Sequence, residues 1–587
     1  MKNQNKIKVA DYITNFLIQK GIKYTFGYIG GAITFVIDSI DNNEKIKFIQ
    51  TYHEQTAAIA AEGYSRNSDS IGVALATSGP GATNLITGIA DAYFDSIPCM
   101  FITGQVNTGE YKYQKKIRQQ GFQETDIVQI VKPIIKYSKL VDSAQEICYE
   151  LEKAYQIAKE GRAGPVLLDI PMNIQKEIID INKIKKYIPD LKKLKPINFS
   201  IIKEVIDKSQ RPIILAGGGI IKSKAEKELI LFATKYKIPV VTSLMGKGSF
   251  PEDNELFIGM IGSYGNRAAN VVLANSDLVF AIGSRLDTRQ TGTNISSFIR
   301  NGTIIHVDID ENELEDNRLN NRIKINADAK TFLGQINFKN YEYNKWLKYI
   351  NNIKLNLSQK NEFLLKDINK IPYLFLNEIN KISRPNDIFT VDIGQNQMFC
   401  AQTLKITKEQ KFFTSGGLAP MGYAIPAAIG ACFACDNKKR IFAIVGDGGF
   451  HISLQSLMLL SQYNLNIKVI VMNNKSLGMI TQFQDANFEK RRFATTNNSG
   501  YLVPTISEIA KAYNLNYSIL KNSSELDKLS IQLIESNKPC IIELLMEDYT
   551  EVVPKLEINS PIEDTSPKLS EKELTKHMLI DLWKTKK

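Results

Sequence analysis

The segment Arg440-Ile-Phe-Ala-Ile-Val-Gly446-Asp447-Gly448 decides the fold, because it predicts an apolar strand that breaks at glycine and presents a carboxylate at its carboxyl end. A second apolar strand, Ile467-Lys-Val-Ile-Val-Met472-Asn473-Asn474, follows after a helical pattern and ends in two amides. Ligands bind beyond the carboxyl ends of strands in a parallel sheet, so a carboxylate and an amide oxygen should lie side by side. Mg²⁺ prefers such oxygen ligands and is usually completed by phosphates. The two segments therefore predict a metal that holds a diphosphate.

The spacing of these two motifs resembles the signature of enzymes that bind thiamine diphosphate (ThDP), in which Gly-Asp-Gly precedes Asn-Asn by a short gap. The plain alternative is a buried strand end whose aspartate, Asp447, caps the next helix. A motif this short does not decide between the two, so the rest of the chain has to.

Length and composition indicate a globular protein of several domains. The 587 residues correspond to about three or four domains, and 43% apolar with 23% charged residues is ordinary for a globular chain. No apolar run reaches the roughly 20 residues of a membrane helix. The first residues lead directly into an amphipathic pattern without a signal-peptide core. We therefore expect a cytoplasmic protein with no membrane partner.

The charge and cysteine patterns exclude two further classes. The net charge of +11 could indicate a nucleic-acid partner, but the lysines are scattered among asparagines and isoleucines, which favours a solvated surface and no nucleic-acid binding. The six cysteines are dispersed, as suits a reducing compartment. Cys432 and Cys435 form a lone pair within a predicted helix, without the second ligand pair that a zinc site needs.

Three blocks of alternating strand and helix patterns organise the chain, and this alternation predicts α/β domains with parallel sheets. The blocks span residues 1–175, 198–335 and 371–550. We therefore expect three doubly wound parallel-sheet domains. The first and third blocks could be duplicated folds, although their residues show no clear repeat.

Two segments outside these blocks carry weaker patterns. A polar connector rich in asparagine and lysine fills residues 337–369. The C-terminal tail, residues 551–587, contains three prolines and then an amphipathic pattern that predicts a helix over 570–583. We expect the tail to pack on the surface or over a site.

Two motifs of the first block point to chemistry. Thr51-Tyr-His53-Glu54-Gln55 closes a strand pattern and opens a helix pattern, so Glu54 should lie near a helix N-terminus, where the helix dipole favours negative charge. A second strand pattern, 71–77, leads into the sharp turn Ser78-Gly79-Pro80-Gly81 and then Ala82-Thr-Asn84. Glu54 is either a first-turn glutamate or a catalytic carboxylate.

With Gly27-Tyr28-Ile29-Gly30-Gly31 and Gly104-Gln105-Val106, these motifs strongly resemble the pyrimidine-binding domain of the acetohydroxyacid (acetolactate) synthase large-subunit family of ThDP enzymes. The resemblance runs from about residue 8 to 545. It implies that Glu54 hydrogen-bonds N1′ of the aminopyrimidine and activates the cofactor. It also implies a set of contacts and catalytic residues on this side of the cofactor: Tyr28, Gly30, Gly31, Pro80, Asn84, Gln105, Phe122 and Gln123.

The third block resembles the diphosphate side of the same family. Val391-Asp-Ile393-Gly394-Gln395-Asn396 matches a diphosphate-binding turn, with Asn396 where the family often has histidine. Met421 matches the catalytic wedge beneath the cofactor, although methionine also suits an ordinary core. The resemblance adds the backbone oxygen of Ser476 as a third protein ligand of Mg²⁺, beside Asp447 and Asn474. The other implied contacts are Ile393, Gly394, Gln395, Asn396, Gly446, Gly448, Gly449, Leu477, Gly478 and Met479.

The middle block resembles the FAD-binding domain of the family. The segment 283–289 matches one in which two arginines approach the FAD diphosphate and flavin, whereas the glycine turn 217–219 is a weak signal alone. Acetolactate synthases bind FAD without net redox use, and the resemblance implies the same here. The implied FAD contacts are Arg162, Gly217, Gly218, Gly219, Ser243, Leu244, Gly262, Ser263, Arg285, Asp287, Arg289, Asp308, Ile309, Asp328 and Ala329.

The family membership implies a carboligase that decarboxylates pyruvate and transfers the two-carbon unit to a second carbonyl. With a second pyruvate the product is 2-acetolactate, a step of branched-chain amino acid biosynthesis. The family places the aminopyrimidine on one subunit and the diphosphate on its neighbour, so we expect at least a homodimer. A homotetramer and a regulatory subunit stay open.

Three segments depart from the family pattern. The stretch 478–484 lacks the usual tryptophan, Met172 stands where lysine is usual, and the loop 107–124 is longer and basic. A lost lysine and a basic loop suit an acceptor whose charge lies farther from its carbonyl, such as the nucleotide-linked keto-deoxysugar of branched-deoxysugar (yersiniose-type) relatives. Harmless drift is the alternative.

Two further hypotheses follow from the same resemblance. One is a flavin-dependent pyruvate oxidase. The other is a binding or regulatory protein that has lost activity, against which the intact Glu54, Asp447, Asn474 and Met421 argue.

Overall fold

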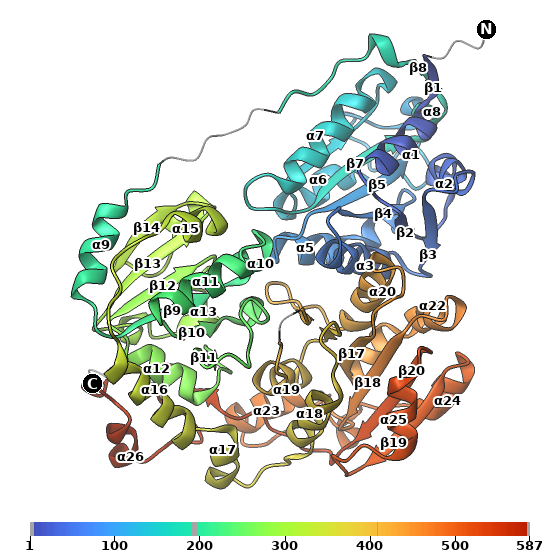
Figure 1. The fold of residues 1–587 in the computed structure, drawn as a ribbon. Coiled ribbons are helices and arrows are strands. Elements are labelled where there is room, and N and C mark those ends of the chain that lie inside the picture. The colour runs from blue at the N-terminus through green and yellow to red at the C-terminus, as the bar shows by residue number, and fades with distance from the viewer. Residues whose placement is uncertain (1–4, 190–195, 408, 584–587) are drawn as a thin grey trace.

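The computed structural model describes residues 5–189, 196–407 and 409–583, and Figure 1 shows three α/β domains that contact one another. Residues 1–4 and 584–587, which belong to the predicted first domain and tail, lie outside the described residues. Each domain is built on a six-stranded sheet in which every paired strand is parallel. The predicted fold class is confirmed.

The strands of the first sheet are β2 (Tyr24–Gly27), β3 (Lys47–Gln50), β4 (Gly72–Ala76), β5 (Cys99–Gln105), β6 (Tyr137–Leu140) and β7 (Val166–Pro171). Those of the middle sheet are β9 (Pro212–Ala216), β10 (Val240–Thr242), β11 (Phe257–Met260), β12 (Leu278–Ile282), β13 (Thr303–Asp308) and β14 (Arg322–Asn326). Those of the third sheet are β15 (Ile388–Val391), β16 (Lys411–Phe413), β17 (Ile441–Gly446), β18 (Ile467–Asn473), β19 (Asn516–Lys521) and β20 (Cys540–Leu545).

The strand orders relate the first sheet to the third. The first sheet runs β3-β2-β4-β5-β7-β6 and the third β16-β15-β17-β18-β20-β19, which is the same order counted from each domain's first strand. The middle sheet runs β11-β10-β9-β12-β13-β14, the 3-2-1-4-5-6 order typical of dinucleotide-binding domains. The strand order reverses between β2 and β4 in the first sheet, between β9 and β12 in the middle sheet, and between β15 and β17 in the third. Ligands bind at such switch points in open parallel sheets.

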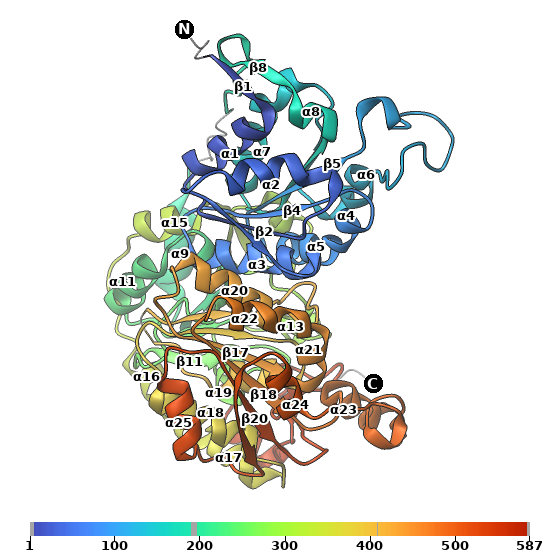
Figure 2. The ribbon, with the colours of Figure 1, turned by 90° about the vertical axis from the view of Figure 1, so that its right-hand side faces the viewer.

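Helices cover both faces of each sheet (Figures 1 and 2). The first domain contains α1 (Val9–Gln19), α2 (Thr34–Asp41), α3 (Glu54–Asn67), α4 (Pro80–Asn84), α5 (Ile86–Phe94), α6 (Ile127–Val131), α7 (Ile147–Lys159) and α8 (Met172–Lys176). The middle domain contains α9 (Phe199–Lys208), α10 (Gly218–Lys222), α11 (Glu226–Tyr236), α12 (Arg267–Asn275), α13 (Thr288–Thr291), α14 (Glu311–Glu315) and α15 (Ala329–Gln335). The third contains α18 (Ile371–Ile382), α19 (Gln395–Thr403), α20 (Ala424–Ala434), α21 (Asp447–Ile452), α22 (Leu457–Gln462), α23 (Gly478–Asn487), α24 (Ile506–Ala512) and α25 (Lys528–Glu535).

The strands are buried because the helices leave neither face of a sheet open, which explains their continuous apolar runs. Among the described residues, no helix combines the length and apolar character needed to cross a bilayer.

The connector between the second and third domains is more ordered than its polar composition indicated. It forms α16 (Asn344–Asn356) and α17 (Gln359–Leu365). Trp346, Ile350 and Ile353 of α16 are buried in the core of the middle domain. Their helical spacing gives one apolar stripe on an otherwise polar helix, which explains why composition alone missed it.

The predicted tail helix over 570–583 is wrong in extent, since only α26 (Glu571–Lys576) forms. Ser570 caps its start, and the chain then leaves the helix at His577, whose carbonyl accepts hydrogen bonds from Asn275 and Tyr349. Earlier in the tail, β21 (Lys555–Leu556) pairs with β22 (Thr565–Ser566). The tail therefore lies against the middle domain.

Candidate active site

The predicted diphosphate and metal motifs meet at one end of the third sheet. The turn 392–394 follows β15, and Asp447 follows the adjacent strand β17. Asn474 follows β18, the next strand in the sheet. The motifs therefore lie at and beside the point where the strand order reverses, because parallel strands end at the same edge.

Three oxygen atoms converge beyond these strands. Asp447 and Asn474 are buried. The side-chain oxygen of Asn474 lies 2.8 Å from the carbonyl oxygen of Ser476 and 3.2 Å from Oδ2 of Asp447. Oxygen atoms this close without a proton between them repel one another unless a cation bridges them. Turning the amide would instead let its nitrogen donate to both oxygens, so the orientation shown here is the one that fits a hard cation such as Mg²⁺.

Within the described residues, no cluster of three or more His, Cys, Asp or Glu side chains suits a metal. The set at Asp447 contains one carboxylate, one amide and one carbonyl. Mg²⁺ is usually held by one or two carboxylates and completed by phosphates and water, so this donor set suits a metal that arrives with a diphosphate.

Tyr501 is a contact that the sequence motifs did not reveal. Its hydroxyl donates to Oδ1 of Asp447 at 2.6 Å, while the backbone N–H of Asn474 donates to Oδ2 at 3.1 Å. Burial raises the pKa of Asp447 to about 6 despite these bonds. Burial and the nearby carboxylate also raise the pKa of Tyr501, so the phenol stays a donor. No pattern around Tyr501 signals this contact.

The predicted diphosphate turn is built around Asp392. This buried carboxylate accepts hydrogen bonds from the backbone N–H groups of Ile393, Gly422 and Ala424 at 2.8–3.0 Å. Gly394 adopts φ 117, a conformation that favours glycine. Asn396 is tied inward, since its Nδ2 donates to the Asp392 carbonyl at 2.8 Å.

Met421 lies over the same glycine-rich strand end. A methyl group placed on Gly448 would lie 2.9 Å from the terminal carbon of Met421, 2.9 Å from Leu477 and 3.0 Å from the Tyr501 hydroxyl. Met421 is only partly buried. The predicted wedge residue, Gly448 and Leu477 are therefore brought together, and glycine at 448 leaves room for all three side chains.

The loop that carries Met421 is fixed by the first domain. Asp95 accepts from the backbone N–H groups of Gly416 and Gly417, at 3.1 and 2.8 Å. Asp91 accepts from the Ser415 hydroxyl, whose oxygen accepts from the Ala419 N–H. Both carboxylates come from or directly follow α5, which sequence motifs left without a role.

Glu54 occupies the switch point of the first sheet. It is the first residue of α3, 6% exposed, and its Oε2 accepts from Asn84 Nδ2 at 2.9 Å. The other oxygen, Oε1, would lie 3.2 Å from a methyl group on Gly81. Glycine at 81 therefore keeps a side chain away from one carboxylate oxygen, while Asn84 holds the other.

The remaining residues predicted in the first domain differ in where the structure places them. Gln123 (φ 62) packs against the turn at Gly79, where an added methyl would lie 2.9 Å from its Cβ. Phe122 is 86% exposed. Both protons of the Gln105 amide go to first-domain acceptors, Asp169 and the Thr125 carbonyl. Tyr28, Gly30 and Gly31 follow β2, and Gly30 lies against Thr77 after β4.

In the middle domain, the predicted glycine turn meets the predicted arginine segment. A methyl group on Gly217 would lie 2.1 Å from the carbonyl oxygen of Gly283, so the two strand ends approach through bare backbone. Gly218 lies against Met245, and Gly219 against Gly283. The N–H groups of Gly217 and Gly219 already donate to the carbonyls of Ile282 and Gly283, both at 2.9 Å, which fixes the turn against the end of β12.

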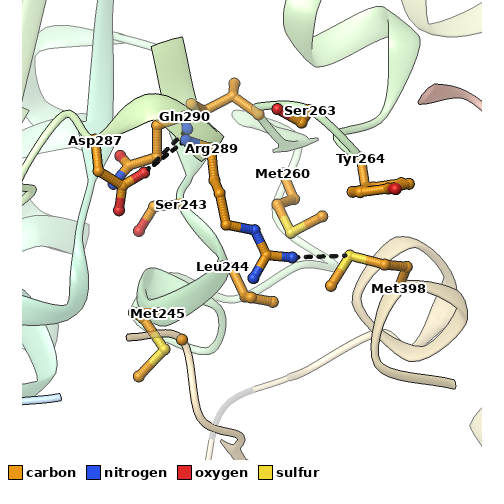
Figure 3. Close-up of a pocket in the computed structure, with 12 residues that line it drawn as sticks. Ser243, Leu244, Met245, Met260, Ser263, Tyr264, Asp287, Arg289, Gln290 and Met398 are labelled. Atoms are coloured by element: carbon orange, nitrogen blue, oxygen red, sulfur yellow. Dashed lines mark hydrogen bonds between the residues drawn. The ribbon is translucent and has the colours of Figure 1, made fainter. Parts of the chain in front are cut away.

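Figure 3 shows a pocket whose lining includes Met245, the residue against which Gly218 of this turn packs. The backbone N–H of Arg289 donates to the Asp287 carboxylate. The Arg289 side chain points toward Met398, and its Nη2 lies 3.9 Å from the Met398 sulfur. Ser243, Leu244 and Ser263 also line it, and Gly262 lies against the Arg289 carbonyl. Arg285 pairs with Asp287 at 3.4 Å. A cationic side chain over a methionine-lined pocket fits an aromatic ring next to a diphosphate.

Four of the predicted FAD contacts, Asp308, Ile309, Asp328 and Ala329, lie at or just beyond the ends of β13 and β14. Burial raises the pKa of Asp308 to about 6, and the Ile309 carbonyl accepts from Asn326. Asp328 caps α15, whose first residue is Ala329. Arg162 of the first domain reaches across to pair with Asp310 and Glu313 at 3.1 and 2.6 Å. Arg162 therefore links two domains at this edge.

Comparisons with known proteins match all three domains to one family. Residues 7–130 match "Thiamine pyrophosphate enzyme, N-terminal TPP binding domain", residues 200–336 the central domain and residues 392–544 the C-terminal TPP binding domain. The acetolactate synthase large subunit of Lactococcus lactis subsp. lactis is 36% identical over 93% of this chain and 94% of its own length. That of Cyanidium caldarium is 36% identical over 94% and 96%, and a probable one of Methanocaldococcus jannaschii 36% over 93% of each.

Proposed function

Since this chain belongs to the thiamine pyrophosphate enzyme family, and within it to the acetolactate synthase large subunits, we propose that it decarboxylates pyruvate and joins the two-carbon unit to a second pyruvate to give 2-acetolactate. It is a ThDP-dependent, acetolactate synthase-like enzyme. The observation that supports the proposal is the oxygen set at Asp447, Asn474 and Ser476, which suits Mg²⁺ bound with a diphosphate.

ThDP supplies the electron sink for decarboxylation when it is bound. In the proposed site, Glu54 holds a proton at Oε1 against a ring nitrogen, because Asn84 already occupies Oε2. Asp447, Asn474 and the Ser476 carbonyl would hold Mg²⁺, and residues 394–396, at the start of α19, would offer backbone N–H groups to phosphate. Met421 and Leu477 place apolar surface beside Gly448, which excludes water from the reacting end.

We also propose that FAD occupies the middle domain. The strand order typical of dinucleotide-binding domains supports this, as do the bare turn 217–219 and the pocket beneath Arg289. Binding without net redox use predicts that the flavin stays oxidised when pyruvate is added without oxygen. Bleaching of the flavin at the catalytic rate would instead support a pyruvate oxidase.

The test is turnover of labelled pyruvate with ThDP, Mg²⁺ and FAD, with 2-acetolactate identified by mass spectrometry. Glu54→Gln should lower the rate by about 10² to 10⁴-fold, as expected for a lost proton-transfer group. Glu152→Gln, which affects a partly exposed pair with Lys20, should leave the rate unchanged. Wild-type turnover by Glu54→Gln would contradict the role of Glu54.

A second acceptor is favoured by one observation. Met172 starts α8 where lysine is usual, and its neighbour Asn173 bonds Thr108 at the start of the basic loop 107–124. The loop and the altered position therefore lie together. Incubation with labelled pyruvate and an equimolar nucleotide-linked keto-deoxysugar tests this alternative. A labelled branched sugar in excess over acetolactate would overturn pyruvate as the acceptor.

A further inference from the structure

The side-chain amide of Asn474 binds a cation only when its oxygen, and not its nitrogen, faces Asp447 and Ser476. The two atoms have nearly the same shape, so the hydrogen-bond network has to fix the orientation. That network runs through Thr550, Gln395 and Gln482. Together with Asn474 these side chains are buried, between 2% and 6% exposed.

The network starts at a backbone segment that fixes Gln482. The N–H of Val552 donates to Oε1 of Gln482 at 3.1 Å, and Nε2 of Gln482 donates to the Val552 carbonyl at 3.1 Å. A backbone N–H can only donate and a carbonyl can only accept. The two ends of the Gln482 amide are therefore assigned without ambiguity.

The next amide follows from the first. Nε2 of Gln395 faces two acceptors, Oε1 of Gln482 at 3.1 Å and the Thr550 carbonyl at 2.8 Å. Its oxygen, Oε1, therefore faces the Thr550 hydroxyl, which donates to it at 2.6 Å. The single proton of Thr550 is used in this bond.

The hydroxyl oxygen of Thr550 can then only accept from Asn474. Nδ2 of Asn474 lies 2.8 Å away and donates to it. Its oxygen consequently faces Asp447 and Ser476. A turned amide would require a proton from Thr550 for its own oxygen, and Gln395 would lose that proton.

We propose that Thr550 is a positioning residue that holds the Asn474 amide oxygen toward the metal, and that the Gln395–Gln482 pair sets the direction of its proton. This inference rests on the proposed metal-dependent cofactor site. Thr550 lies two residues before Val552, whose backbone is held by Gln482. The start of the C-terminal segment therefore supports a ligand of the proposed metal site.

The Thr550→Val variant removes the hydroxyl but keeps the shape. Without that acceptor the Asn474 amide is free to turn, and its nitrogen then donates to Ser476 and Asp447 and closes the site to a cation. Loss of an outer-shell partner typically lowers metal affinity by about 10 to 100-fold, and we expect a loss of that size for Mg²⁺. Thr550→Ser keeps the hydroxyl and should bind Mg²⁺ as tightly as the wild type does.

The experiment is calorimetric titration of Mg²⁺ into the full-length protein with saturating ThDP and FAD. Ser518→Ala is the control, because it removes a buried hydroxyl that bonds the Ser530 hydroxyl in the same domain. It should bind Mg²⁺ as the wild type does. Thermal melting shows whether each variant is folded, and Thr550→Ala replaces Thr550→Val if the valine variant does not fold.

Equal Mg²⁺ affinity of wild type and a folded Thr550→Val or Thr550→Ala variant would overturn the inference, as would a loss in Thr550→Ser as large as in Thr550→Val. The proposed function fails separately: a wild-type protein that shows no Mg²⁺-dependent ThDP binding would refute the metal site itself.

Discussion

At the residue scale, burial raises the pKa of Asp447, the carboxylate of the proposed metal site, to about 6, because the charged form is poorly solvated there. A bound cation favours the charged form, so proton and metal compete for the same side chain.

This competition predicts a pH dependence of metal binding. With a pKa near 6, the charged fraction of Asp447 falls from about nine-tenths at pH 7 to about one-tenth at pH 5. The apparent Mg²⁺ affinity of the ThDP-loaded protein should therefore fall about tenfold over this range. Calorimetry measures it, after correction for the affinity of free ThDP for Mg²⁺. An affinity that is flat between pH 5 and 7 would show that burial does not raise this pKa.

Tyr501 gives a second prediction at this scale. Its hydroxyl donates a short bond of 2.6 Å to Oδ1 of Asp447, whereas Oδ2 accepts a longer one of 3.1 Å from the Asn474 N–H and faces the side-chain oxygen of Asn474. This difference favours binding of the proposed metal through Oδ2 alone. Mg²⁺ demands near-octahedral geometry, whereas Ca²⁺ accepts a two-oxygen carboxylate. Tyr501→Phe should therefore weaken Mg²⁺ by about 10 to 100-fold and Ca²⁺ clearly less, by the same titration.

The control is Tyr137→Phe, which removes a tyrosine–carboxylate hydrogen bond to Glu150 in the first domain. It should leave both affinities unchanged. If Tyr501→Phe lowered the Mg²⁺ and Ca²⁺ affinities equally, Tyr501 would not control how Asp447 coordinates the ion.

At the element scale, the first and third domains join through two helices packed at backbone distance. A methyl group on Gly430 of α20 would lie 1.8 Å from the Ala60 carbonyl of α3, and one on Gly63 would lie 2.1 Å from the Ala427 carbonyl. Glu54 begins α3, and the Met421 loop leads into α20. The packing of these helices therefore sets how Glu54 and the Met421 loop of one chain are placed relative to each other.

Gly430→Ala tests this contact. Overpacking of a well-packed core costs about 1–3 kcal/mol or more, so the variant should unfold at lower urea concentration. Gly334→Ala is the control, because nothing lies within 4 Å of the added methyl and alanine favours the helix by up to about 1 kcal/mol. A Gly430→Ala variant as stable as Gly334→Ala would mean that the helices separate easily.

At the scale of the whole molecule, three sheets place their switch points where the predicted motifs lie. The hydrogen bonds of Glu54 stay within the first domain and those of Asp447 within the third. Phe122, Phe493 and Leu502 are 86%, 54% and 72% exposed. In the expected dimer, two chains would cover such side chains. Glu54 of one chain and Asp447 of the other would then belong to one site.

Mixing two inactive variants tests a site shared between chains. Glu54→Gln and Asp447→Asn should each be inactive alone. In a re-associated equimolar mixture, half of the dimers are mixed, and each mixed dimer contains one intact site, so about a quarter of the wild-type activity should return. Light scattering should show a dimer or larger assembly. A mixture without activity would indicate that each chain builds its own site.

The sequence by itself determined the elements and the chemistry that depends on short spacing. The apolar runs before Asp447 and Asn474, and the helix start at Glu54, follow from local periodicity and turn residues. The parallel sheets and the family follow from motifs in order along the chain. The connector helix at Trp346 was missed because its apolar stripe is narrow. The tail helix was predicted too long because Asn275 and Tyr349, far away in the sequence, bind the carbonyl of His577 just after its last turn.

Only the tertiary structure decided what lies around those motifs. Tyr501 and Thr550 reach the proposed metal site from segments tens of residues away. Asp95 reaches the Met421 loop from another domain. Such contacts carry no local signal, because one hydrogen bond between distant residues leaves no periodicity in the chain. The direction of the Asn474 amide depends on a series of such bonds, so it exists only once the chain has folded.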